Sequence, residues 1–542
     1  MIHVWTEKIP NVTAYAAAHI NDLQNKKLDS YDVGAYASFA AAVAAIGATA
    51  ARLWINSSTA VTTTVVLPAT LELCFMYGGE LAIANGVTVT VNGPISAGHF
   101  KIFTCTGTGA VVLGAYAATL VYPQWWGADG TGAAYSWAAF QAMLTAVPAN
   151  QKIYIPGGQY DIGATLTLPS AKRLSIIGAG LNSTALYFNP TVNDDTLIST
   201  VDQDNVLFQD LSLTCSNTGS KSGLVGIDLP AGSSAFKFIR VNFYGWNKYA
   251  VKMDSATYHE FWGCRFHSNE NSAFNTALAV AVYSTTYANA ILFNGCRFAE
   301  NDQCFNINTS GAGFDITACK FEENGNSGNT FGFTAQLLFE GVRGLVIDGA
   351  TYFEGNLCGD TDAVIRFVSC PGAIVEGNKF SGESGVSVVS ESFIYLYDSP
   401  RTRIANNHFA EINDYVVRFF GTSSAFLENN TYINGGVEKT AYADIMALMS
   451  SPSLVQLDVP VAFTWDPGNL IDGTGETSGD IAVLGLTAGD MVLVGAPYDL
   501  QGIIHSGYFH DTNVAHIRLQ NETTGAIDLG SGSWKLKIFK NL

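Results

Sequence analysis

The stretches EFWGCRFHSN (260–269), LFNGCRFAEN (292–301) and ITACKFEEN (316–324) decide the fold of this 542-residue chain. Each is a short strand, a turn and a polar close around an aromatic residue. Five further copies extend the series: RVNFYGW (240–246), IDGATYFEGN (347–356), IVEGNKFSGE (374–383), IANNHFAEI (404–412) and LENNTYING (427–435). Internal repetition of this kind indicates a solenoid, in which each unit packs on its neighbours.

The closing aromatics form one column with a variable period. They are Phe243, Phe266, Phe298, Phe321, Phe353, Phe380, Phe409 and Tyr432, separated by 23 to 32 residues. Leucine-rich, ankyrin and tetratricopeptide repeats keep a tighter period, whereas the coils of a parallel β-helix only have to bring each strand back over the previous one. We therefore predict an all-β fold, a parallel β-helix that is right-handed by the crossover rule.

A second column lies two residues before each closing aromatic. Its members are Cys264, Cys296, Cys319, Thr351, Asn378, Asn407 and Asn430. Strand alternation sends both columns to the same side, so the aromatics are expected to stack inside and the Asn side chains to form a hydrogen-bonded ladder. The thiols are expected to fill the same slot without that bond. A structural role is favoured over a metal site, because a metal needs mixed ligands that converge on one point.

Composition excludes several classes of function. Charged residues make up 13% of the chain, and 27 Lys and Arg against 46 Asp and Glu leave a formal net charge of −19. Without basic tracts, nucleic-acid binding through phosphate neutralisation is not expected. The nine cysteines show neither CxxC nor zinc spacing, and we expect them to be reduced and mostly buried.

Residues 33–51 are uncharged and about long enough to cross a bilayer. They are mostly small residues, with Phe39, Val43 and Ile46 at helical spacing, which predicts a short amphipathic helix and no membrane insertion. The chain begins MIHVWTEKIPN, which is unlike a Sec-type signal peptide.

The rest of the chain suggests five segments. We predict a stem or docking segment at 1–30, a small β region with a short helix at 31–121, the β-helix at 122–440, a linker at 441–478 and a β-sandwich or jelly-roll-like domain at 479–542. A helix at 136–149, with Trp137, Phe140, Met143 and Leu144 on one face, is expected to cap the open end of the β-helix.

Several motifs add a family resemblance. They are Trp125-Trp126-Gly127-Ala128, the helix that follows, YIPGGQY (154–160) and IGAG (177–180), and together they resemble the entry to pectate-lyase-like β-helix proteins, especially phage tailspikes. The family's acidic D-G-x-x-D-D run is reduced here to Asp129-Gly130. Residues 479–542 are similar to small β domains that end phage fibres.

The resemblance implies a homotrimer in the virion. Its N-terminal region would dock on a tail or baseplate protein, and its β-helix would face a bacterial surface polysaccharide, either capsule or lipopolysaccharide. The resemblance implies no cofactor. By the same resemblance the protein would act outside the host cell, and an opening that is unlike a signal peptide agrees with release by lysis.

Glycan hydrolysis needs two carboxyl groups, one protonated and one ionised. Coils about 4.8 Å apart bring equivalent side chains close to the separation of about 5 Å used by retaining enzymes. The predicted catalytic residues are Glu300, Glu323, Asp302 and Glu354. The predicted substrate-binding residues are Trp246, Tyr258, Trp262, His267 and Glu322, since aromatic faces match sugar rings.

Two other functions stay open. A polysaccharide lyase needs a base and a cationic group beside a uronic carboxylate, and Tyr258, His259, Arg265 and His267 are candidates for those roles. A receptor-binding spike that holds a glycan without cutting it fits the same fold, because the fold does not define the site.

Overall fold

A computed structural model describes residues 29–541 except 201, 216–220, 271–278, 309, 326–334, 357–362, 383–391, 413–414, 452–454 and 458. The chain forms two compact units, one up to residue 161 together with 172–177, the other 162–171 together with 178–542. The predicted docking segment 1–30 lies outside the described residues except for positions 29 and 30. Among the described residues, no helix has the length and apolar character needed to cross a membrane.

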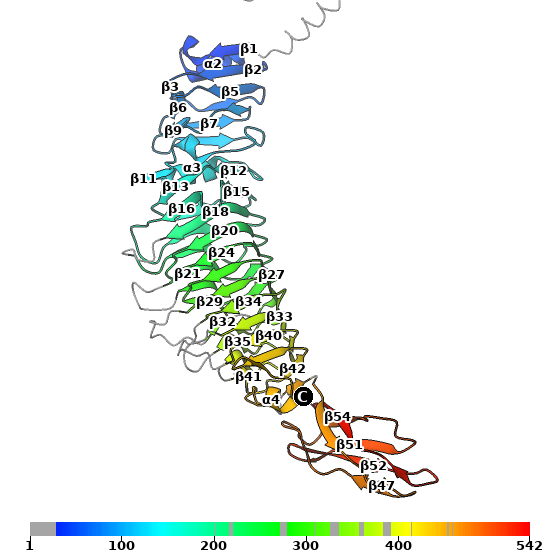
Figure 1. Cartoon of the computed structure of the whole chain (residues 1–542). Helices are drawn as coiled ribbons and strands as arrows, with labels where there is room; N and C mark the ends of the chain where they lie inside the picture. The colour runs from blue at the N-terminus through cyan, green and yellow to red at the C-terminus, as the bar shows by residue number, and fades with distance from the viewer. Residues whose placement is uncertain are drawn as a thin grey trace, which may run out of the picture. The chain divides into compact units, whose positions relative to one another are not determined.

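The first unit begins with a three-sided parallel solenoid (Figure 1). Its sheets are β1 (Asp29–Asp32), β2 (Ala51–Ile55), β5 (Leu71–Phe75) and β8 (Ile95–Ser96); β3 (Ser58–Val61), β6 (Glu80–Ile83) and β9 (Phe103–Cys105); and β4 (Val65–Leu67), β7 (Thr88–Val91) and β10 (Ala110–Leu113). Leu53 pairs with Leu73, and Leu73 with Ile95, in parallel register. The predicted small β region is thus a solenoid itself.

Both predicted helices of this unit are present. The unit contains η1 (Val33–Ala35), α2 (Phe39–Ile46), η2 (Pro123–Trp126), β11 (Thr131–Tyr135), α3 (Trp137–Ala146), β12 (Lys152–Ile155), β13 (Gly158–Ile162) and β15 (Ser175–Gly178). The Ser38 hydroxyl caps α2 by accepting from the amide of Ala41 at 3.1 Å. In α3, Phe140, Met143 and Leu144 are buried, but Trp137, the first residue of the helix, is 37% exposed.

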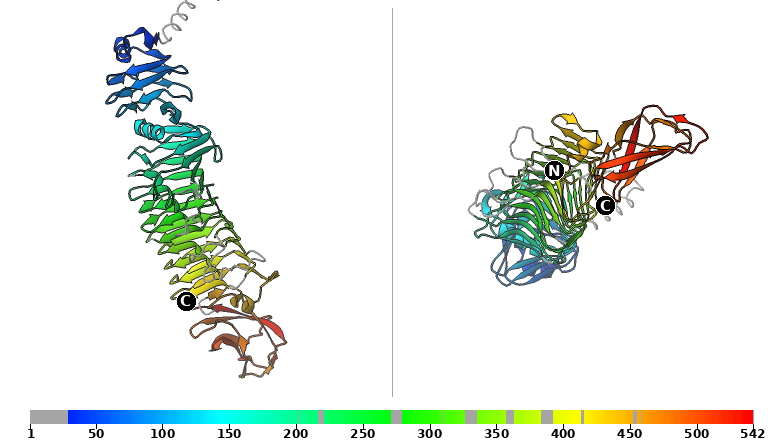
Figure 2. Two further views of the ribbon diagram at one scale, coloured as in Figure 1. Left: turned by 90° about the vertical axis from the view of Figure 1, so that its left-hand side faces the viewer. Right: turned by 90° about the horizontal axis from the view of Figure 1, so that it is seen from below.

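The second unit contains a right-handed parallel β-helix, and successive coils lie one above the other in Figure 2. One wall is a sheet of β14 (Leu166–Leu168), β17 (Thr196–Thr200), β19 (Val225–Leu229), β21 (Tyr249–Met253), β25 (Val280–Ser284), β29 (Gln303–Asn308), β32 (Ala335–Glu340), β35 (Ala363–Val368), β38 (Ser392–Tyr397) and β41 (Tyr415–Phe420). A two-stranded sheet pairs β22 (Ala256–Thr257) with β26 (Ala288–Asn289).

The other wall carries the predicted repeats. It begins with β16 (Thr184–Phe188), β18 (Leu207–Cys215) and β20 (Lys237–Tyr244), and then has two short strands per coil: β23 (Glu260–Trp262) and β24 (Arg265–His267), β27 (Ile291–Asn294) and β28 (Arg297–Ala299), β30 (Ala312–Thr317) and β31 (Lys320–Glu322), β33 (Arg343–Asp348) and β34 (Tyr352–Glu354), β36 (Ile374–Glu376) and β37 (Lys379–Ser381), β39 (Thr402–Ala405) and β40 (His408–Ala410), β42 (Ala425–Glu428) and β43 (Thr431–Asn434). β45 (Val455–Leu457) pairs with β42, and β44 (Val437–Glu438) with β43.

The break between the two strands of a coil explains the glycine or asparagine that most repeats have at this point. Gly263 and Gly295 have φ of 58° and 63°, and Asn406 has φ of 55°. Glycine adopts this left-handed conformation without a steric cost, and asparagine tolerates it. The bend turns the next residue inward, which places the Cys and Asn column in the core.

The predicted aromatic column is confirmed. Phe266 and Phe298 stack with centroids 4.5 Å apart and ring planes 2° apart, and Phe298 stacks on Phe321 at 4.8 Å. A second stack, which the sequence reasoning did not predict, joins Phe261 to Phe293 at 4.4 Å. These rings are fully buried, so they supply much of the core.

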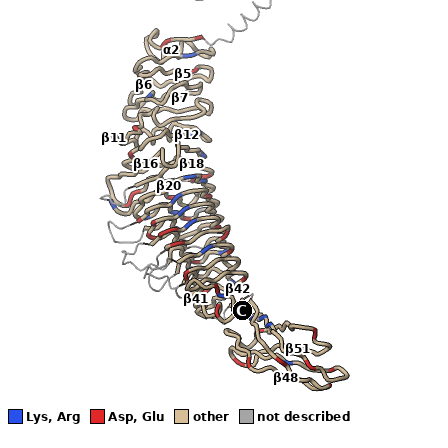
Figure 3. The backbone as a smooth tube through the Cα atoms, in the orientation of Figure 1, with Lys and Arg blue, Asp and Glu red and all other residues tan. Residues whose placement is uncertain are grey.

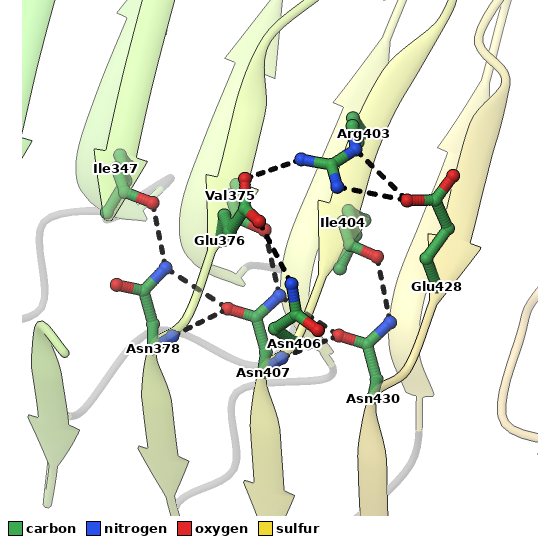
Figure 4. Close-up of polar contacts among 10 residues, drawn as sticks. All are labelled: Ile347, Val375, Glu376, Asn378, Arg403, Ile404, Asn406, Asn407, Glu428 and Asn430. Carbon is green, nitrogen blue, oxygen red and sulfur yellow. Dashed lines mark hydrogen bonds and ion pairs between the residues drawn. The ribbon is translucent and has the colours of Figure 1, made fainter. Parts of the chain in front are cut away.

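The predicted asparagine ladder is also confirmed (Figure 4). Asn407 Nδ2 donates to Val375 O at 2.8 Å and to Asn430 Oδ1 at 3.1 Å, while its Oδ1 accepts from the Asn378 amide at 2.9 Å. The thiols were expected to form no such bond, and this is wrong. Cys264 Sγ lies 3.4 Å from Phe238 O, because the inward side chain points at the carbonyl of the neighbouring coil.

A second ladder follows the aromatic column. It consists of Asn269, Asn301, Asn324 and Asn356, three residues after Phe266, Phe298, Phe321 and Phe353. The side-chain oxygens of Asn301, Asn324 and Asn356 each accept from the asparagine of the preceding coil, at 2.7, 2.9 and 2.9 Å. That of Asn269 accepts from the Trp246 amide at 3.0 Å. This ladder fixes the turn that leaves the repeat wall.

The C-terminal part of the second unit is antiparallel. Its strands are β46 (Val461–Trp465), β47 (Asn469–Leu470), β48 (Gly475–Thr477), β49 (Ile481–Ala482), β50 (Met491–Gly495), β51 (Ile504–Asp511), β52 (Val514–Gln520), β53 (Ile527–Asp528) and β54 (Gly532–Phe539). Residues 461–477, predicted as linker, pair with β52, β53 and β54, since Phe463 and Trp465 supply an apolar face that the turn residues around them obscure. The helix that precedes these strands, α4 (Tyr442–Met446), is short.

Candidate functional site

The predicted carboxylates lie at the ends of β31 and β34 and in the turns that follow β24, β28 and β31. We call this the turn surface: His267, Ser268, Glu270, Glu300, Asp302, Glu322, Glu323 and Glu354. Glu300 and Glu323 occupy equivalent left-handed positions in consecutive coils, with φ of 53° each. The amide of Glu300 donates to Glu322 O at 3.4 Å, and that of Glu323 to Glu354 O at 3.0 Å. Both carboxylates are exposed, so the two predicted groups lie side by side facing solvent.

Glu270 and Asp302 form the inner part of the turn surface. They follow Asn269 and Asn301 of the second ladder, and the Asp302 amide donates to Asn269 O at 3.0 Å. Asp302 is fully buried, and its Oδ2 accepts from the Ala279 amide at 3.1 Å. Partial burial raises the pKa of Glu270, and the charges of Asp302 and Glu300 raise it further. Glu270 therefore favours the protonated form more than an ordinary glutamate does.

A hydrogen-bonded chain links His267 to Glu300. His267 Nδ1 lies 2.5 Å from Ser268 Oγ, and Ser268 Oγ donates to Glu300 Oε2 at 3.1 Å. The imidazole is also 3.8 Å from the same carboxylate. Glu300 is thus held by a side chain of the neighbouring coil while its carboxylate stays accessible to solvent.

The remaining carboxylates, Glu322 and Glu354, differ in whether a neighbouring cation pairs with them. Glu322 accepts from Arg297 Nε at 2.7 Å, so its charge is matched within the wall. Its Cα partner in the next coil is Glu354, which is exposed. Glu354 also contributes to the raised pKa of Tyr352, about 12, after the burial of that phenol.

A column of cations borders the turn surface. Arg265, Arg297, Lys320 and Lys379 occupy the exposed position before the closing aromatic, with Tyr352 between the two lysines. Lys379 Nζ lies 5.1 Å from the Tyr352 ring centroid. Figure 3 shows acidic and basic residues together over these coils. The surface therefore presents both signs of charge to a ligand.

The three predicted aromatic contacts have different environments. Trp246 is fully buried, and its indole donates to Leu213 O at 3.1 Å, so its proposed contact with a sugar is withdrawn. Tyr258 is 62% exposed. Trp262 is partly exposed on the outer face of β23, where its indole donates to Glu260 at 2.8 Å. Tyr258 and Trp262 can thus meet a ligand, before the bend that leads to His267.

His259 and Arg265, two candidates for the base and the cationic group of a lyase, also have different environments. His259 is fully buried, and its Nδ1 accepts from the Phe236 amide at 3.1 Å. Burial lowers its pKa to about 3, so the ring is a neutral core residue. Arg265 is exposed on the outer wall.

A second pair of carboxylates lies on the repeat wall, where β33 and β36 end. Asp348 ends β33 and Glu376 ends β36, one coil apart. Burial and then the charge of Glu376 raise the pKa of Asp348. A hydrogen bond from Arg403 (Figure 4) is the largest cause that lowers the pKa of Glu376. Environments that separate two pKa values are typical of acid and base pairs, so this pair competes with the turn surface.

Sequence reasoning missed Glu270, Ser268 and the Asp348–Glu376 pair. The endings HSNE, AEND and EENG already align Glu270 with Asp302, one position after the second ladder. Long insertions at 272–290 and 325–336 would also be expected to project as loops that could wall a cleft. Residues 272–278 and 326–334 lie outside the described residues, whereas 280–284 and 288–289 form β25 and β26. Within the described residues, the turn surface contains no three ligand side chains close enough to share a metal ion.

Together these features define a right-handed parallel β-helix with a carboxylate-lined outer surface and an antiparallel C-terminal β domain. No protein-family model matches the sequence, and a search of curated proteins finds no match. Solved structures with a similar fold include the Dettilon tailspike protein, at 10% identity, 78% of this chain, 95% of that chain and a TM-score of 0.41.

Two more similar structures come from different proteins. The Pseudomonas phage phi297 tailspike shares 10% identity over 77% of this chain and 98% of that chain, with a TM-score of 0.40. An alginate lyase from Paenibacillus sp. shares 12% identity over 58% of this chain and 97% of that chain, with a TM-score of 0.39. At these values the similarity concerns the fold and does not define a substrate or a reaction.

Proposed function

We propose that this protein is a phage tailspike that binds a bacterial surface polysaccharide, capsule or lipopolysaccharide, and cleaves it by acid/base glycoside hydrolysis. The motifs at 125–128, 154–160 and 177–180 support the tailspike assignment. The observation that carries the hydrolase is the raised pKa of Glu270 beside Asp302 and Glu300. A protonated and an ionised carboxyl group side by side are the minimum that this reaction needs.

In this proposal Glu270 is the general acid and protonates the glycosidic oxygen of the leaving group. Glu300, held by Ser268, is the ionised partner that attacks the sugar or activates a water molecule. Asp302 is too buried to touch substrate, so it acts as a positioning residue whose charge, after burial, raises the pKa of Glu270. Glu323, one coil away, extends the acidic subsite together with Glu354.

The neighbouring side chains would hold the glycan. Tyr258 and Trp262 offer apolar ring faces, and His267 and Glu322 offer hydrogen bonds. The column of Arg265, Arg297, Lys320 and Lys379 adds cations along the coils, which favours a polysaccharide that carries carboxylate groups. The homotrimer, docking through 1–30 and a place in the virion tail belong to the same proposal and rest on the resemblance alone.

A screen against host polysaccharides tests this function. Purified protein is incubated with capsular and lipopolysaccharide preparations, and reducing ends, ultraviolet absorbance of unsaturated products and binding are measured together. Hydrolysis produces reducing ends without that absorbance, whereas a lyase produces both. Binding without either product would identify a non-catalytic adhesin and overturn the assignment of Glu270.

A further inference from the structure

Three strands of the C-terminal domain bring an aspartate and two histidines onto one face. β52 lies between β49 and β51. Because Ile481 pairs with Ala515, the preceding Asp480 lies opposite His516. Tyr508 is the direct partner of His516 on β51. His510, two residues further along that strand, lies where the register of the β51–β52 pairing shifts, and its ring stacks on that of His516. Strand pairing therefore places Asp480 opposite His516, and the ring contact places His510 beside them.

The ligand atoms of these three residues nearly converge. His516 Nε2 lies 2.7 Å from Asp480 Oδ1, and the rings of His510 and His516 stack with centroids 3.9 Å apart. One donor atom from each residue lies within 4.8 Å of the other two. Two nitrogen ligands of one zinc ion are at most about 4.2 Å apart, so small side-chain rotations suffice to bind an ion.

The surroundings also suit a ligand histidine. The Tyr508 hydroxyl lies 3.4 Å from His516 Nδ1, which leaves Nε2 directed at Asp480. Metal-binding histidines commonly use the second ring nitrogen in this way, which fixes the tautomer and the orientation of the ring. The His516 side chain is 12% exposed and that of Asp480 is 74% exposed, so the remaining coordination positions would face solvent.

A simple ion pair accounts for only two of the three residues. It explains the contact of His516 with Asp480, but it gives no role to His510, whose ring stacks on that of His516. A cation shared by all three explains the cluster. Two imidazoles and one carboxylate form a ligand set that suits zinc and similar divalent transition metals better than Mg²⁺ or Ca²⁺.

We propose that Asp480, His510 and His516 form a binding site for a divalent first-row transition-metal ion, with solvent completing the coordination. The site is independent of the turn surface and of polysaccharide cleavage. It would join β49, β51 and β52 and so stabilise the C-terminal domain.

Titration of tag-free protein with ZnCl₂ tests the proposal. Isothermal calorimetry should give one site per chain, with affinity at least tenfold lower in His510→Ala and in Asp480→Asn. His505→Ala, on the same strand but outside the cluster, should bind zinc like the parent. Co²⁺ spectra of the parent should show d–d bands that His510→Ala loses, and MgCl₂ should produce no binding heat.

The folded state of each variant is checked by circular dichroism, and His510 is exposed, so its replacement leaves the core intact. If the parent binds no zinc at 100-fold molar excess, or if His510→Ala and Asp480→Asn bind like the parent, the proposal is wrong. An ion pair alone would give the first of these results.

Discussion

Replacement of Asn407 by alanine tests whether the ladder holds the coils together. The substitution removes four side-chain hydrogen bonds: two accepted from Asn378 and two donated, to Val375 O and Asn430 Oδ1. Asn430 Oδ1 keeps the Asn407 amide, and Asn378 Nδ2 keeps Ile347 O. The side-chain partners of the Asn378 amide and the Val375 carbonyl are lost, and both residues are buried.

The expected cost follows mainly from the Asn378 amide, because the Val375 carbonyl stays within the parallel pairing of β36 with β39. A buried polar group left unsatisfied costs about 1–3 kcal/mol, so Asn407→Ala should destabilise this region by about 1–3 kcal/mol. Since about 1.4 kcal/mol corresponds to a factor of ten, the lower limit accelerates local opening roughly fivefold. Asn407→Cys should lose less, because Cys319 in the same column lies 3.6 Å from the equivalent carbonyl, Phe293 O.

Hydrogen exchange measured by mass spectrometry gives the readout. Exchange of peptides that cover β36 and β37 should accelerate about fivefold or more in Asn407→Ala. Asn294→Ala, on the outer face of β27, is the control and should change stability by less than about 0.5 kcal/mol. If Asn407→Ala and Asn294→Ala exchange at the same rate, the ladder does not hold the coils and the reasoning fails.

Three further predictions concern buried charges. The pKa of His259 is about 3 in the folded protein and about 6.5 in the unfolded chain, so its contribution to stability is complete above pH 6.5. Below pH 6.5 the free energy of unfolding falls by up to about 1.4 kcal/mol per pH unit. In thermal melts, His259→Asn, which keeps an acceptor for the Phe236 amide, should therefore lose less stability in acid than the parent. Glu270 has a raised pKa, so its ionisation reduces stability as pH rises, and Glu270→Gln should gain melting temperature relative to the parent between pH 4 and pH 7; a loss at pH 7 would contradict this. Lys540 and Asp490 form an ion pair whose side chains are only 2% and 1% exposed. Lys540→Ala should therefore lower the free energy of unfolding of the C-terminal domain by about 3–5 kcal/mol in denaturant titrations. The double variant Lys540→Met with Asp490→Leu should recover most of that loss.

The sequence predicted the repeat wall well because its pattern is set by packing. An inward aromatic and an inward Asn or Cys must recur in every coil, so the register can be read from the letters, and the pairing of Phe266 with Phe298 follows. The N-terminal solenoid was recognised only as a β region. Its coils contain no repeated aromatic or asparagine motif, so strand alternation alone could not show that the pairing is parallel.

The site was harder to predict because exposure depends on three-dimensional surroundings. Alternation alone left Trp246 undecided between core and surface, and its burial required knowledge of the coil that covers it. Asp302 and Glu300 are two residues apart in the sequence, yet one is fully buried and the other exposed. The raised pKa of Glu270 depends on this burial and on charges from the neighbouring coil, which a list of carboxylates does not reveal.

The central claim is that the turn surface, rather than the Asp348–Glu376 pair, cleaves the polysaccharide. Initial rates of reducing-end release by the parent, Glu270→Gln and Asp348→Asn, measured on one polysaccharide that the parent cleaves, test it most directly. Glu270→Gln should be at least about 100-fold slower, as expected for loss of a general acid, and Asp348→Asn should stay within about twofold of the parent. Reducing-end release by Glu270→Gln at the rate of the parent would contradict the account, and so would loss of activity in Asp348→Asn.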